Sequence, residues 1–474
     1  MLISFTFENW KSYGEENCLN LQAGSKKSHA EQLASLPSYP SLKILPLTTV
    51  YGSNASGKTN LFTALAFVKK FITQGPELLN NSLLEKPIKT IPVIPCHTGT
   101  TIDYTQKPTS FTIVFAAQQP DNLWNPRNSK KYHSTETIYE LEFSLYNDTV
   151  ISEKLSYLLG NGTAKTLYTR DTHGITLSDK LKTVPDYSLL NEACSLMINN
   201  QETLFLTYTI FQRIPTFSAA WQWFNQTLNL WSKDTFIPIK TDEHYLDVLS
   251  HVLHAMDTGI TKITATEVTN LPEQIQKFTQ QFTKGNKDSS VRITALCTEK
   301  DNDGIPIDIY AVETGGGRES QISQLQTEHN GHLIGFRNES SGTRRLIEVS
   351  LILFDIFCHK NNHLWILDEI EREFHTGLTE LILRIFLDKC TPETRTQVIL
   401  STHDFMLMDQ NLLRPDEILI IDRDNDGLST MTPLDAYQGI RNDLDIRRSY
   451  CEGRFGGIPS FNRVQIEESL TNYK

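Results

Sequence analysis

Apolar and polar residues alternate at the start of the chain, where Ile3, Phe5 and Phe7 are separated by Ser and Thr. A period of two predicts a half-buried β-strand. Residues 43–51 form a longer apolar run that contains Pro46. Because proline cannot donate a hydrogen bond to a strand ladder, we expect a strand end or a bulge at Pro46. The first part of the chain is therefore predicted to be β-rich.

The spacing of apolar residues changes directly after residues 52–60. Leu61, Leu65, Val68 and Ile72 recur at intervals of three to four residues. This spacing puts them on one face of an α-helix. The sequence thus predicts a strand, a short glycine-containing loop and a helix in immediate succession.

The middle of the chain contains two kinds of hydrophobic pattern, one typical of strands and one typical of helices. Residues 110–116 and 138–146 have strand patterns, and the polar, proline-containing residues 118–135 between them predict a loop. Residues 218–231 and 243–257 have helical spacing instead. No heptad repeat is sustained, which counts against a long coiled coil.

The strand pattern returns over residues 290–336, with two strands expected around residues 301–304. From residue 339 onward, helical and strand patterns alternate, as in a parallel sheet flanked by helices. We predict an α/β fold: an ABC-type P-loop ATPase head with a mixed or parallel sheet, an N-terminal β lobe and a mostly helical insertion. The expected parts are an N-terminal ATPase lobe at 1–185, the insertion at 186–289 and a C-terminal ATPase lobe at 290–474.

The composition of the chain indicates its net charge and its expected cellular compartment. The 474 residues include 44 Lys and Arg against 56 Asp and Glu, which gives a net charge of −12. An average negative field disfavours general binding to a phosphate backbone, although a local basic patch could still bind nucleic acid. There is no secretory pattern, no apolar run long enough to span a membrane and no CxxC pair among the seven cysteines. We therefore expect a cytoplasmic protein with reduced thiols and no membrane segment.

The clearest chemical motif is the loop between the predicted strand and helix. It matches the P-loop pattern GxxxxGK[ST] at every specified position. Its backbone N–H groups would bind phosphate oxygens, Lys58 would contact the β- and γ-phosphates, and the Thr59 hydroxyl would ligate Mg²⁺. The predicted nucleotide-binding residues of this loop are Gly52, Ser53, Asn54, Ala55, Ser56, Gly57, Lys58, Thr59 and Asn60.

A second candidate follows the apolar strand 364–367, which ends in Asp368 and Glu369. A buried strand has no solvation reason to end in two carboxylates, but a magnesium site supplies one. We predict that Asp368 holds Mg²⁺ and that Glu369 orients or deprotonates the attacking water. Two surface acids in a strand-end loop are the alternative.

A third candidate is His403, which follows Gln397, the apolar residues 398–400 and a Ser-Thr pair. Its position 35 residues after Asp368 leaves room for one helix and one returning strand. We predict that His403 hydrogen-bonds a γ-phosphate, whereas a satisfied structural histidine is the common alternative.

The fourth candidate is the small-residue turn Ser340-Ser341-Gly342, which precedes a helical pattern. A helix N-terminus attracts anions through its free N–H groups and its dipole. An ordinary N-cap at Ser340 or Ser341 would have the same geometry. The two interpretations differ only in whether a phosphate binds, and the sequence leaves both open.

The acidic residues 422–427 imitate the opening of an EF-hand loop, but the twelfth position is Pro433 and a strand pattern precedes them. We therefore predict a hairpin turn. Only 47 residues follow Gly427, too few for a TOPRIM nuclease domain after such acids. Any nuclease chemistry would then belong to a separate protein.

Together, the order of P-loop, Ser-x-Gly turn, Asp-Glu strand and Ser-Thr-His strand resembles the ABC class of ATPases, in which the signature lies between the two Walker motifs. The resemblance narrows with residues 9–12 (NWKS), 51–60 (YGSNASGKTN), 339–343 (ESSGT) and 453–459 (GRFGGIP). These look like the stand-alone bacterial ATPases related to overcoming-lysogenization-defect (OLD) and SMC-type proteins, whose members include RloA and the AriA subunit of the PARIS defence system. The chain keeps His375 but lacks the proline that commonly follows it in that family.

The resemblance implies a function. Two ATP-bound heads would face each other, with Ser340 and Gly342 of one contacting the γ-phosphate held by Lys58 of the other. Such a homo-oligomer would control a separate effector, a TOPRIM-type or other nuclease, in response to a phage-encoded trigger. The alternative is an SMC-like DNA-repair or chromosome-processing ATPase, which the net charge of −12 and the missing heptads disfavour. A transporter ATP-binding subunit is disfavoured by the 282 residues between Lys58 and Ser340.

Overall fold

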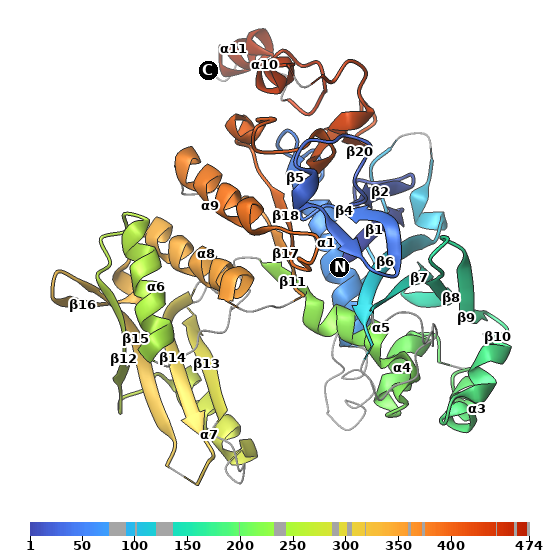
Figure 1. The fold of residues 1–474 in the computed structure, drawn as a ribbon, viewed down its shortest axis with the longest axis horizontal. Helices are drawn as coiled ribbons and strands as arrows, with labels where there is room; N and C mark the ends of the chain where they lie inside the picture. The colour runs from blue at the N-terminus through green and yellow to red at the C-terminus, as the bar shows by residue number, and fades with distance from the viewer. Residues whose placement is uncertain are drawn as a thin grey trace. The chain divides into compact units, whose positions relative to one another are not determined.

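The computed structural model describes residues 1–74, 92–99, 102–119, 136–198, 200–231, 243–286, 293–300, 306–317, 319–358, 362–371, 375–441, 443–458 and 462–471. The chain packs as two compact units. The first consists of Met1–Leu230, Asn362–Ile370 and Leu383–Lys474, and the second of Trp231–Asn361 and Glu371–Ile382. Figure 1 shows the elements of each unit. The boundaries predicted near residues 185 and 290 remain a prediction, and most of the loop predicted at 118–135 lies outside the described residues.

A six-stranded sheet, ordered β11-β17-β18-β5-β19-β20, lies at the centre of the first unit. β17, β18, β5 and β19 run parallel, and β20 returns antiparallel to β19. All residues of β5, β17 and β18 are buried, as in parallel sheets with both faces covered. The strands span Leu228–Trp231 (β11), Leu364–Leu367 (β17), Gln397–Ser401 (β18), Leu47–Tyr51 (β5), Ile418–Arg423 (β19) and Ser429–Pro433 (β20).

The predicted N-terminal β lobe is a seven-stranded antiparallel sheet in the order β10-β9-β8-β7-β6-β1-β2. The alternation at Ile3, Phe5 and Phe7 belongs to β1, as expected. A short two-stranded sheet, β3 (Ala34–Leu36) with β4 (Tyr39–Ile44), precedes Pro46, where the strand pattern breaks as predicted. The lobe strands span Leu2–Glu8 (β1), Asn17–Asn20 (β2), Thr109–Gln118 (β6), Glu136–Tyr146 (β7), Thr149–Leu158 (β8), Ala164–Asp171 (β9) and Gly174–Leu177 (β10).

The helix α1, Lys58–Thr73, directly follows the predicted phosphate-binding loop and packs on this lobe. All four residues that predicted its apolar face are buried: Leu61, Leu65, Val68 and Ile72. Phe67 of α1 stacks on Phe111 of β6, with ring centroids 5.5 Å apart. Phe111 in turn lies 5.3 Å from Phe143 of β7. The aromatic rings therefore fix the helix that carries Lys58 against the β lobe.

A single buried amide links the lobe to the parallel sheet. Gln397, at the start of β18, accepts a hydrogen bond from the Leu2 N–H at 2.6 Å and donates to the carbonyls of Leu2 and Leu45 at 3.0 and 3.1 Å. Because buried backbone groups must be hydrogen-bonded, this side chain serves as their partner in both Leu2 and Leu45.

The helix predicted at residues 218–231 extends over only the first part of this range. The helix α5, Ser218–Gln222, passes into a π-helical turn at Trp223–Thr227, and the chain then becomes the strand β11. Trp223 and Phe224 pack on Phe115 at centroid distances of 4.5 and 5.0 Å. The helical spacing of the sequence ends where β11 joins the edge of the six-stranded sheet, because pairing with β17 requires extended backbone.

The second unit consists of a sheet and the helices packed on it. The sheet order is β12-β15-β14-β13, with β16 paired to β15. α6 packs on β12 and on α8, and α7 packs on β13 and β14. The strands on either side of residues 301–304 and the helix within 243–257 confirm those predictions. The elements span Glu243–Ala255 (α6), Lys262–Glu267 (β12), Glu273–Asn286 (α7), Ile293–Lys300 (β13), Pro306–Thr314 (β14), Gln321–His329 (β15), His332–Gly335 (β16) and Ser341–Cys358 (α8).

The acidic residues 422–427 form the turn of the β19–β20 hairpin, as predicted. Gly427 has a φ of 84°, and Asp424 accepts a side-chain bond from the Leu428 N–H at 2.8 Å. Among the described residues, no group of three or more His, Cys, Asp or Glu is placed to hold a metal ion. The remaining helices are α3 (Tyr187–Leu196), α4 (Phe205–Phe211), α9 (Thr376–Lys389), α10 (Ile446–Cys451) and α11 (Arg463–Thr471).

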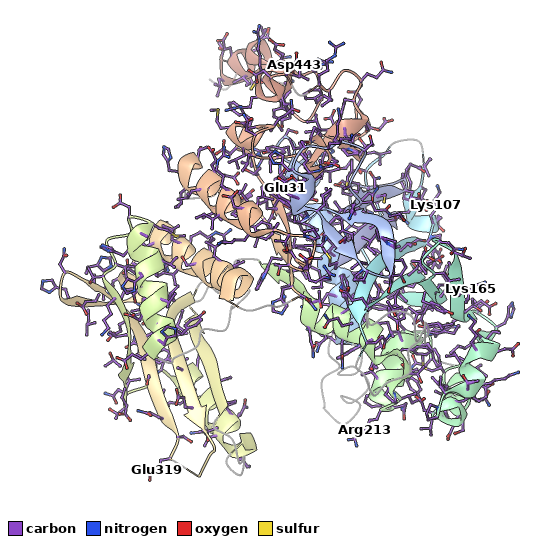
Figure 2. All side chains as sticks on the ribbon, viewed as in Figure 1. Glu31, Lys107, Lys165, Arg213, Glu319 and Asp443 are labelled. Atoms are coloured by element: carbon purple, nitrogen blue, oxygen red, sulfur yellow. The ribbon has the colours of Figure 1, made fainter. Side chains whose placement is uncertain are left out.

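The architecture is an α/β fold with a strand–loop–helix at its centre, a mixed sheet flanked by helices and an N-terminal β lobe. The predicted α/β class, with a mixed sheet flanked by helices and an N-terminal β lobe, is confirmed. Within 186–289, helices predominate over the short strands β11 and β12 in the part that the structure describes. The side chains of both units are drawn in Figure 2, in which the exposed Lys165 lies on β9. Among the described helices, none has the length and apolar character needed to cross a bilayer.

Candidate functional site

The loop between β5 and α1 has the backbone conformation of an anion cradle. Ala55 and Gly57 have φ values of 62° and 119°, both in the left-handed region. Successive N–H groups in such turns face one concavity, and the first N–H groups of α1 have no acceptor within the helix. A Cβ at Gly57 would lie 2.5 Å from the Ser429 Oγ, and a Cβ at Gly52 would lie 2.5 Å from the Ser56 Oγ. Both positions therefore require glycine.

The remaining predicted loop residues differ in exposure. Asn54, Ala55 and Thr59 are exposed, Ser53 and Asn60 are half-buried, and Ser56 is buried. Within the described residues, the Ser56 Oγ is a buried polar atom without a hydrogen-bond partner. The cradle therefore holds one hydroxyl that a ligand or water could satisfy.

Lys58 is buried, and its ammonium group lies inside the loop. Its Nζ donates to the carbonyl of Gly52 at 2.8 Å and to the carbonyl of Ser53 at 3.0 Å. A buried ammonium needs such acceptors because desolvation of an unpaired charge is costly. These bonds hold the positive charge at the mouth of the cradle, where a phosphate oxygen could take their place.

The structure brings the P-loop threonine and the acid of β17 together. The Thr59 Oγ1 donates to the Asp368 Oδ2 at 3.1 Å, across 309 residues of sequence. A hydroxyl and a carboxylate are hard oxygen donors, which are the ligands that Mg²⁺ prefers. Mg²⁺ commonly takes few protein ligands and completes its shell with water and phosphate oxygens. The pair therefore suits a magnesium ion that arrives with a nucleotide.

Strand order explains this approach. β18 lies between β17 and β5, and all three run parallel. Parallel strands present their carboxyl ends at one edge, where ligands bind in open α/β sheets. The P-loop, Asp368 and the residues after β18 consequently share that edge.

Ser401, the last residue of β18, is a site residue that the sequence pattern did not single out. Its hydroxyl donates to the Asp368 Oδ1 at 2.5 Å, and its oxygen accepts the Glu369 N–H at 2.8 Å. One serine thus orients both acids of the pair. The available signal was a polar residue at the end of the buried run 397–400, which by itself does not separate a site residue from a strand terminus.

Glu369 has a φ of 49°, an uncommon value for a non-glycine residue. The Glu369 Oε1 lies 3.9 Å from the His403 Nε2, and both side chains are partly exposed. The structure therefore places Glu369 and His403, both predicted from strand ends, within reach of each other at the same edge. Strained backbone of this kind persists where surrounding contacts hold it, and here Ser401 supplies one such contact.

The glycine-rich segment near the C-terminus packs against the P-loop. A Cβ at Gly457 would lie 3.5 Å from the Gly52 Cα and 2.8 Å from the Ile420 Cγ2. Tyr450 of α10 donates to the Gly457 carbonyl at 2.9 Å and packs edge-on against Tyr51 of β5. The segment around Gly457 therefore packs closely against Gly52, the first residue of the P-loop.

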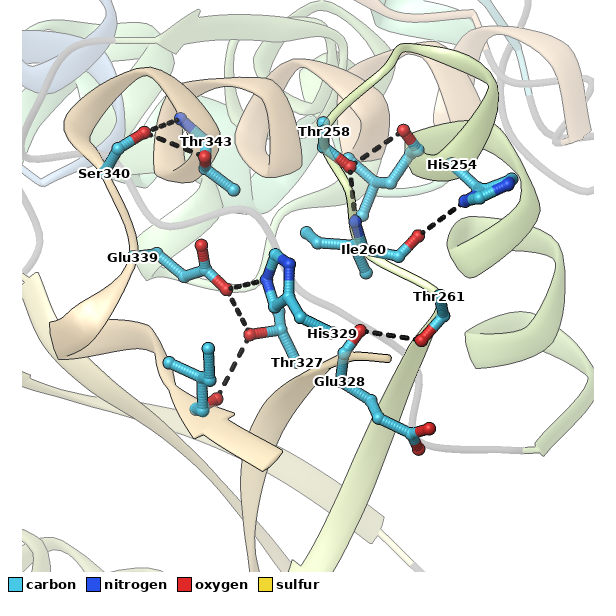
Figure 3. Close-up of polar contacts among 12 residues, drawn as sticks. His254, Thr258, Ile260, Thr261, Thr327, Glu328, His329, Glu339, Ser340 and Thr343 are labelled. Atoms are coloured by element: carbon cyan, nitrogen blue, oxygen red, sulfur yellow. Dashed lines mark hydrogen bonds and ion pairs between the residues drawn. The ribbon is translucent and has the colours of Figure 1, made fainter. Parts of the chain in front are cut away.

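The predicted signature residues Ser340 and Gly342 belong to the second unit. The Ser340 Oγ accepts the Thr343 N–H at 3.0 Å and lies 2.8 Å from the Thr343 Oγ1 (Figure 3). Ser340 is therefore the N-cap of α8, which begins at Ser341. Ser340 and Ser341 are exposed, and Gly342 is half-buried.

Glu339, the residue before this turn, is held in place by side chains of β15. Glu339 is buried, and its Oε1 lies 2.7 Å from the His329 Nε2 and accepts a hydrogen bond from the Thr327 hydroxyl (Figure 3). Thr327 and His329 both belong to β15. The predicted signature turn, residues 340–342, is thus connected to the sheet of the second unit through the buried carboxylate of Glu339.

These features define a P-loop ATPase head in which the strand–loop–helix, the Asp-Glu strand end and the His-bearing strand end lie at one edge of a parallel sheet. A family model described as "AAA domain, putative AbiEii toxin, Type IV TA system" matches residues 240–409. That range is less than half of the chain and contains the signature turn, the two acids and His403, but not the P-loop. The match agrees with an AAA-type ATPase domain. No curated protein matches the chain.

Solved structures of SMC heads are similar over most of the chain. An SMC head bound to the C-winged helix domain of ScpA is 14% identical with a TM-score of 0.38, and covers 91% of this chain and 97% of its own. An SMC head from Pyrococcus furiosus with an extended coiled coil, bound to the C-terminal domain of ScpA, is 13% identical with a TM-score of 0.35, covering 91% and 95%. An SMC head from Thermotoga maritima is 11% identical with a TM-score of 0.32, covering 91% and 98%. These scores are too low to establish a shared fold, which rests instead on this chain's own strands and helices.

Proposed function

We propose that this protein binds and hydrolyses ATP with Mg²⁺ as an ABC-type ATPase. The observation that carries the proposal is the 3.1 Å approach of the Thr59 hydroxyl to the Asp368 carboxylate, beside the buried Lys58. Two oxygen ligands and one ammonium group thereby converge on a glycine cradle. That set has the ligand types expected for a magnesium–triphosphate ion, with oxygen donors for the metal and a positive charge for the phosphates.

The residues have distinct roles in this proposal. The loop from Gly52 to Asn60 binds the phosphates through backbone N–H groups, and Lys58 neutralises the β- and γ-phosphate charge. Thr59 and Asp368 hold the metal, which would polarise the transferred phosphoryl group when bound. Glu369 accepts the proton of the attacking water or orients it, and His403, 3.9 Å away, contacts the γ-phosphate.

We further propose that hydrolysis takes place between two copies of the head. Ser340 and Gly342 lie at the N-terminus of α8, a helix of 18 residues, and Ser340 is exposed. A helix N-terminus carries partial positive charge and favours an anion. In the family that the sequence resembles, this turn of one head contacts the γ-phosphate of the other. The γ-phosphate would then join two protomers, and its hydrolysis would release them.

The biological role that fits best is that of a cytoplasmic sensor or scaffold in a bacterial anti-phage system, with a separate effector nuclease as its partner. Two observations support it: the resemblance to RloA-like and AriA-like ATPases, and a matching family model whose description refers to a toxin–antitoxin system. ATP-driven assembly of heads would hold or release the effector when a phage-encoded trigger appears.

The test is a comparison of nucleotide binding, turnover and assembly in purified variants. Wild-type protein should bind and hydrolyse ATP, Lys58→Ala should lose binding, and Glu369→Gln should bind ATP but accumulate as an ATP-dependent assembly on sizing. Lys165→Ala, which removes an exposed lysine of β9, is the matched control and should behave as wild type. Turnover that survives in Lys58→Ala would refute the assignment. Strong stimulation by duplex DNA would instead favour the SMC-like repair function.

A further inference from the structure

The β19–β20 hairpin forms one edge of the six-stranded sheet and also contacts the P-loop. Its turn brings the chain back so that Ser429, the first residue of β20, pairs with Arg423, the last residue of β19. Because β19 is parallel to the P-loop strand β5, this end of the hairpin lies at the phosphate-binding edge. Ser429 is buried there, with 2% of its surface exposed.

Ser429 contacts the P-loop directly. Its Oγ lies 2.5 Å from the carbonyl oxygen of Ser56 and 2.8 Å from the hydroxyl of Ser12. The Ser12 Oγ also accepts a bond from the Asn60 Nδ2 at 2.8 Å. The backbone reinforces the contact, since the Ser429 N–H donates to the Ser12 carbonyl at 2.8 Å.

The chemistry of these groups orders the hydrogen bonds. A carbonyl oxygen only accepts, and a serine hydroxyl has one proton. The Ser429 hydroxyl is placed to donate both to the Ser56 carbonyl at 2.5 Å and to the Ser12 oxygen at 2.8 Å, and its one proton is best used in the shorter bond, to the carbonyl. The resulting chain of contacts runs from the amide of Asn60 through Ser12 and Ser429 to the Ser56 carbonyl, and the Ser12 oxygen is an acceptor for both Asn60 and Ser429.

This chain fixes the direction of one peptide group. In a trans peptide the C=O and the following N–H point in opposite directions, and the described residues contain no cis peptide. Holding the Ser56 carbonyl toward Ser429 therefore turns the Gly57 N–H toward the opposite side, away from Ser429. The adjacent Gly57 carbonyl is held in the same manner by the buried Tyr13 hydroxyl at 3.1 Å.

The fit also restricts both partners. A Cβ at Gly57 would lie 2.5 Å from the Ser429 Oγ, 3.0 Å from its Cβ and 3.1 Å from the Ser12 Oγ. Gly57 adopts a φ of 119°, which favours glycine independently of this contact. The hydroxyl of Ser429 fills the space beside the glycine and supplies its neighbour's hydrogen bond.

We propose that Ser429 is a positioning residue for nucleotide binding, which orients the Ser56–Gly57 peptide so that the Gly57 N–H faces the phosphates. This inference rests on the proposed ATP-binding function. Ser429 itself does not contact the nucleotide. It acts through the loop, and Ser12 and Asn60 act through Ser429.

The test is the dissociation constant of MgATP and of MgADP for Ser429→Ala, measured by calorimetry on the full chain well below the melting temperature of each variant. Loss of one N–H bond to a charged group should raise both constants by about tenfold. Ser12→Ala leaves the Ser429 donor in place and should have a smaller effect. Thr430→Ala, which removes an exposed hydroxyl from the same strand, is the control and should bind as wild type.

The outcomes separate this inference from the proposed function. A structural role for Ser429 would lower the melting temperature of the nucleotide-free protein and leave both dissociation constants unchanged. If wild type binds ATP, Lys58→Ala does not, and Ser429→Ala binds as tightly as wild type, the positioning role is wrong while the ATPase assignment stands. A larger loss in Ser12→Ala than in Ser429→Ala would also overturn it. If wild type binds no ATP, the proposed function fails first.

Discussion

The hydroxyl of Ser401 donates to the Asp368 carboxylate at 2.5 Å. The two residues end neighbouring parallel strands, so the register of β17 and β18 sets this distance. The same oxygen accepts the N–H of Glu369 at 2.8 Å. Asp368, the proposed magnesium ligand, and Glu369 next to it are therefore both oriented by one residue of the adjacent strand.

Replacing this serine should weaken metal use. In Ser401→Ala the Asp368 Oδ1 loses a charge-assisted hydrogen bond, which is typically worth about 1.5–3 kcal/mol. We expect the Mg²⁺ concentration for half-maximal ATPase activity to rise by roughly tenfold, with a smaller change in ATP affinity. Mg²⁺ titration of steady-state turnover measures this. Ser195→Ala removes an exposed hydroxyl and should leave the titration unchanged; an identical titration for both variants would contradict the orienting role.

The left-handed backbone of Glu369, with a φ of 49°, predicts a conflict between stability and function. Glycine adopts this conformation without the steric cost paid by other residues. Glu369→Gly should therefore raise the free energy of unfolding, by up to about 1 kcal/mol, while turnover falls to background. Denaturant unfolding and ATPase assays measure the two effects.

Asn330→Gly is the comparison for that experiment, because Asn330 has a φ of 51° in the exposed β15–β16 turn. It should be stabilised to a similar extent without losing activity. A Glu369→Gly protein that keeps wild-type turnover would remove Glu369 from the mechanism.

The Glu339–His329 contact predicts a defect in assembly that is separate from nucleotide binding. Glu339 precedes the signature turn, and its Oε1 lies 2.7 Å from the His329 Nε2. His329→Ala should loosen the turn and weaken ATP-dependent association of heads several-fold, while the dissociation constant of ATP for the single head stays the same. Sizing and calorimetry on one preparation measure both quantities. His332→Ala, exposed on the neighbouring strand, should do neither, and equal association in His329→Ala and wild type would refute the coupling.

Glu417 predicts a pH-dependent stability. Burial raises the pKa of its carboxyl from 4.5 to about 8, and its Oε1 has no hydrogen-bond partner within the described residues. The folded state therefore binds a proton that the unfolded state releases. This contribution to stability is fully present below about pH 4.5 and is lost as the pH rises toward 8.

In that window the free energy of unfolding should fall by up to about 1.4 kcal/mol per pH unit from this group. Glu417→Gln carries no titrating proton and should flatten the dependence, with its largest gain near pH 8. Urea unfolding at several pH values tests this. Glu393→Gln, an exposed carboxyl, should reproduce the wild-type slope, and a wild-type slope in Glu417→Gln would show that another group is responsible.

Local patterns were sufficient for several elements. The residues Leu61, Leu65, Val68 and Ile72 predicted α1, and the acids and Gly427 of residues 422–427 predicted the β19–β20 turn, because helix periodicity and turn chemistry are properties of adjacent residues. The same local logic failed at residues 228–231. Helical spacing there gave way to a strand, because hydrogen bonding to β17 outweighed local preference.

The sequence by itself determined which residues could carry the chemistry: a phosphate loop, two carboxylates and a histidine, each at the end of an apolar strand. Only the tertiary structure decided which of them meet. Strand order placed β18 between β17 and β5, which brought Thr59 within 3.1 Å of Asp368 and made Ser401 the residue that orients the acids. It also placed Ser429 beneath the P-loop. Pairings across hundreds of residues depend on how strands assemble into a sheet, and that arrangement has no signature in the neighbouring sequence.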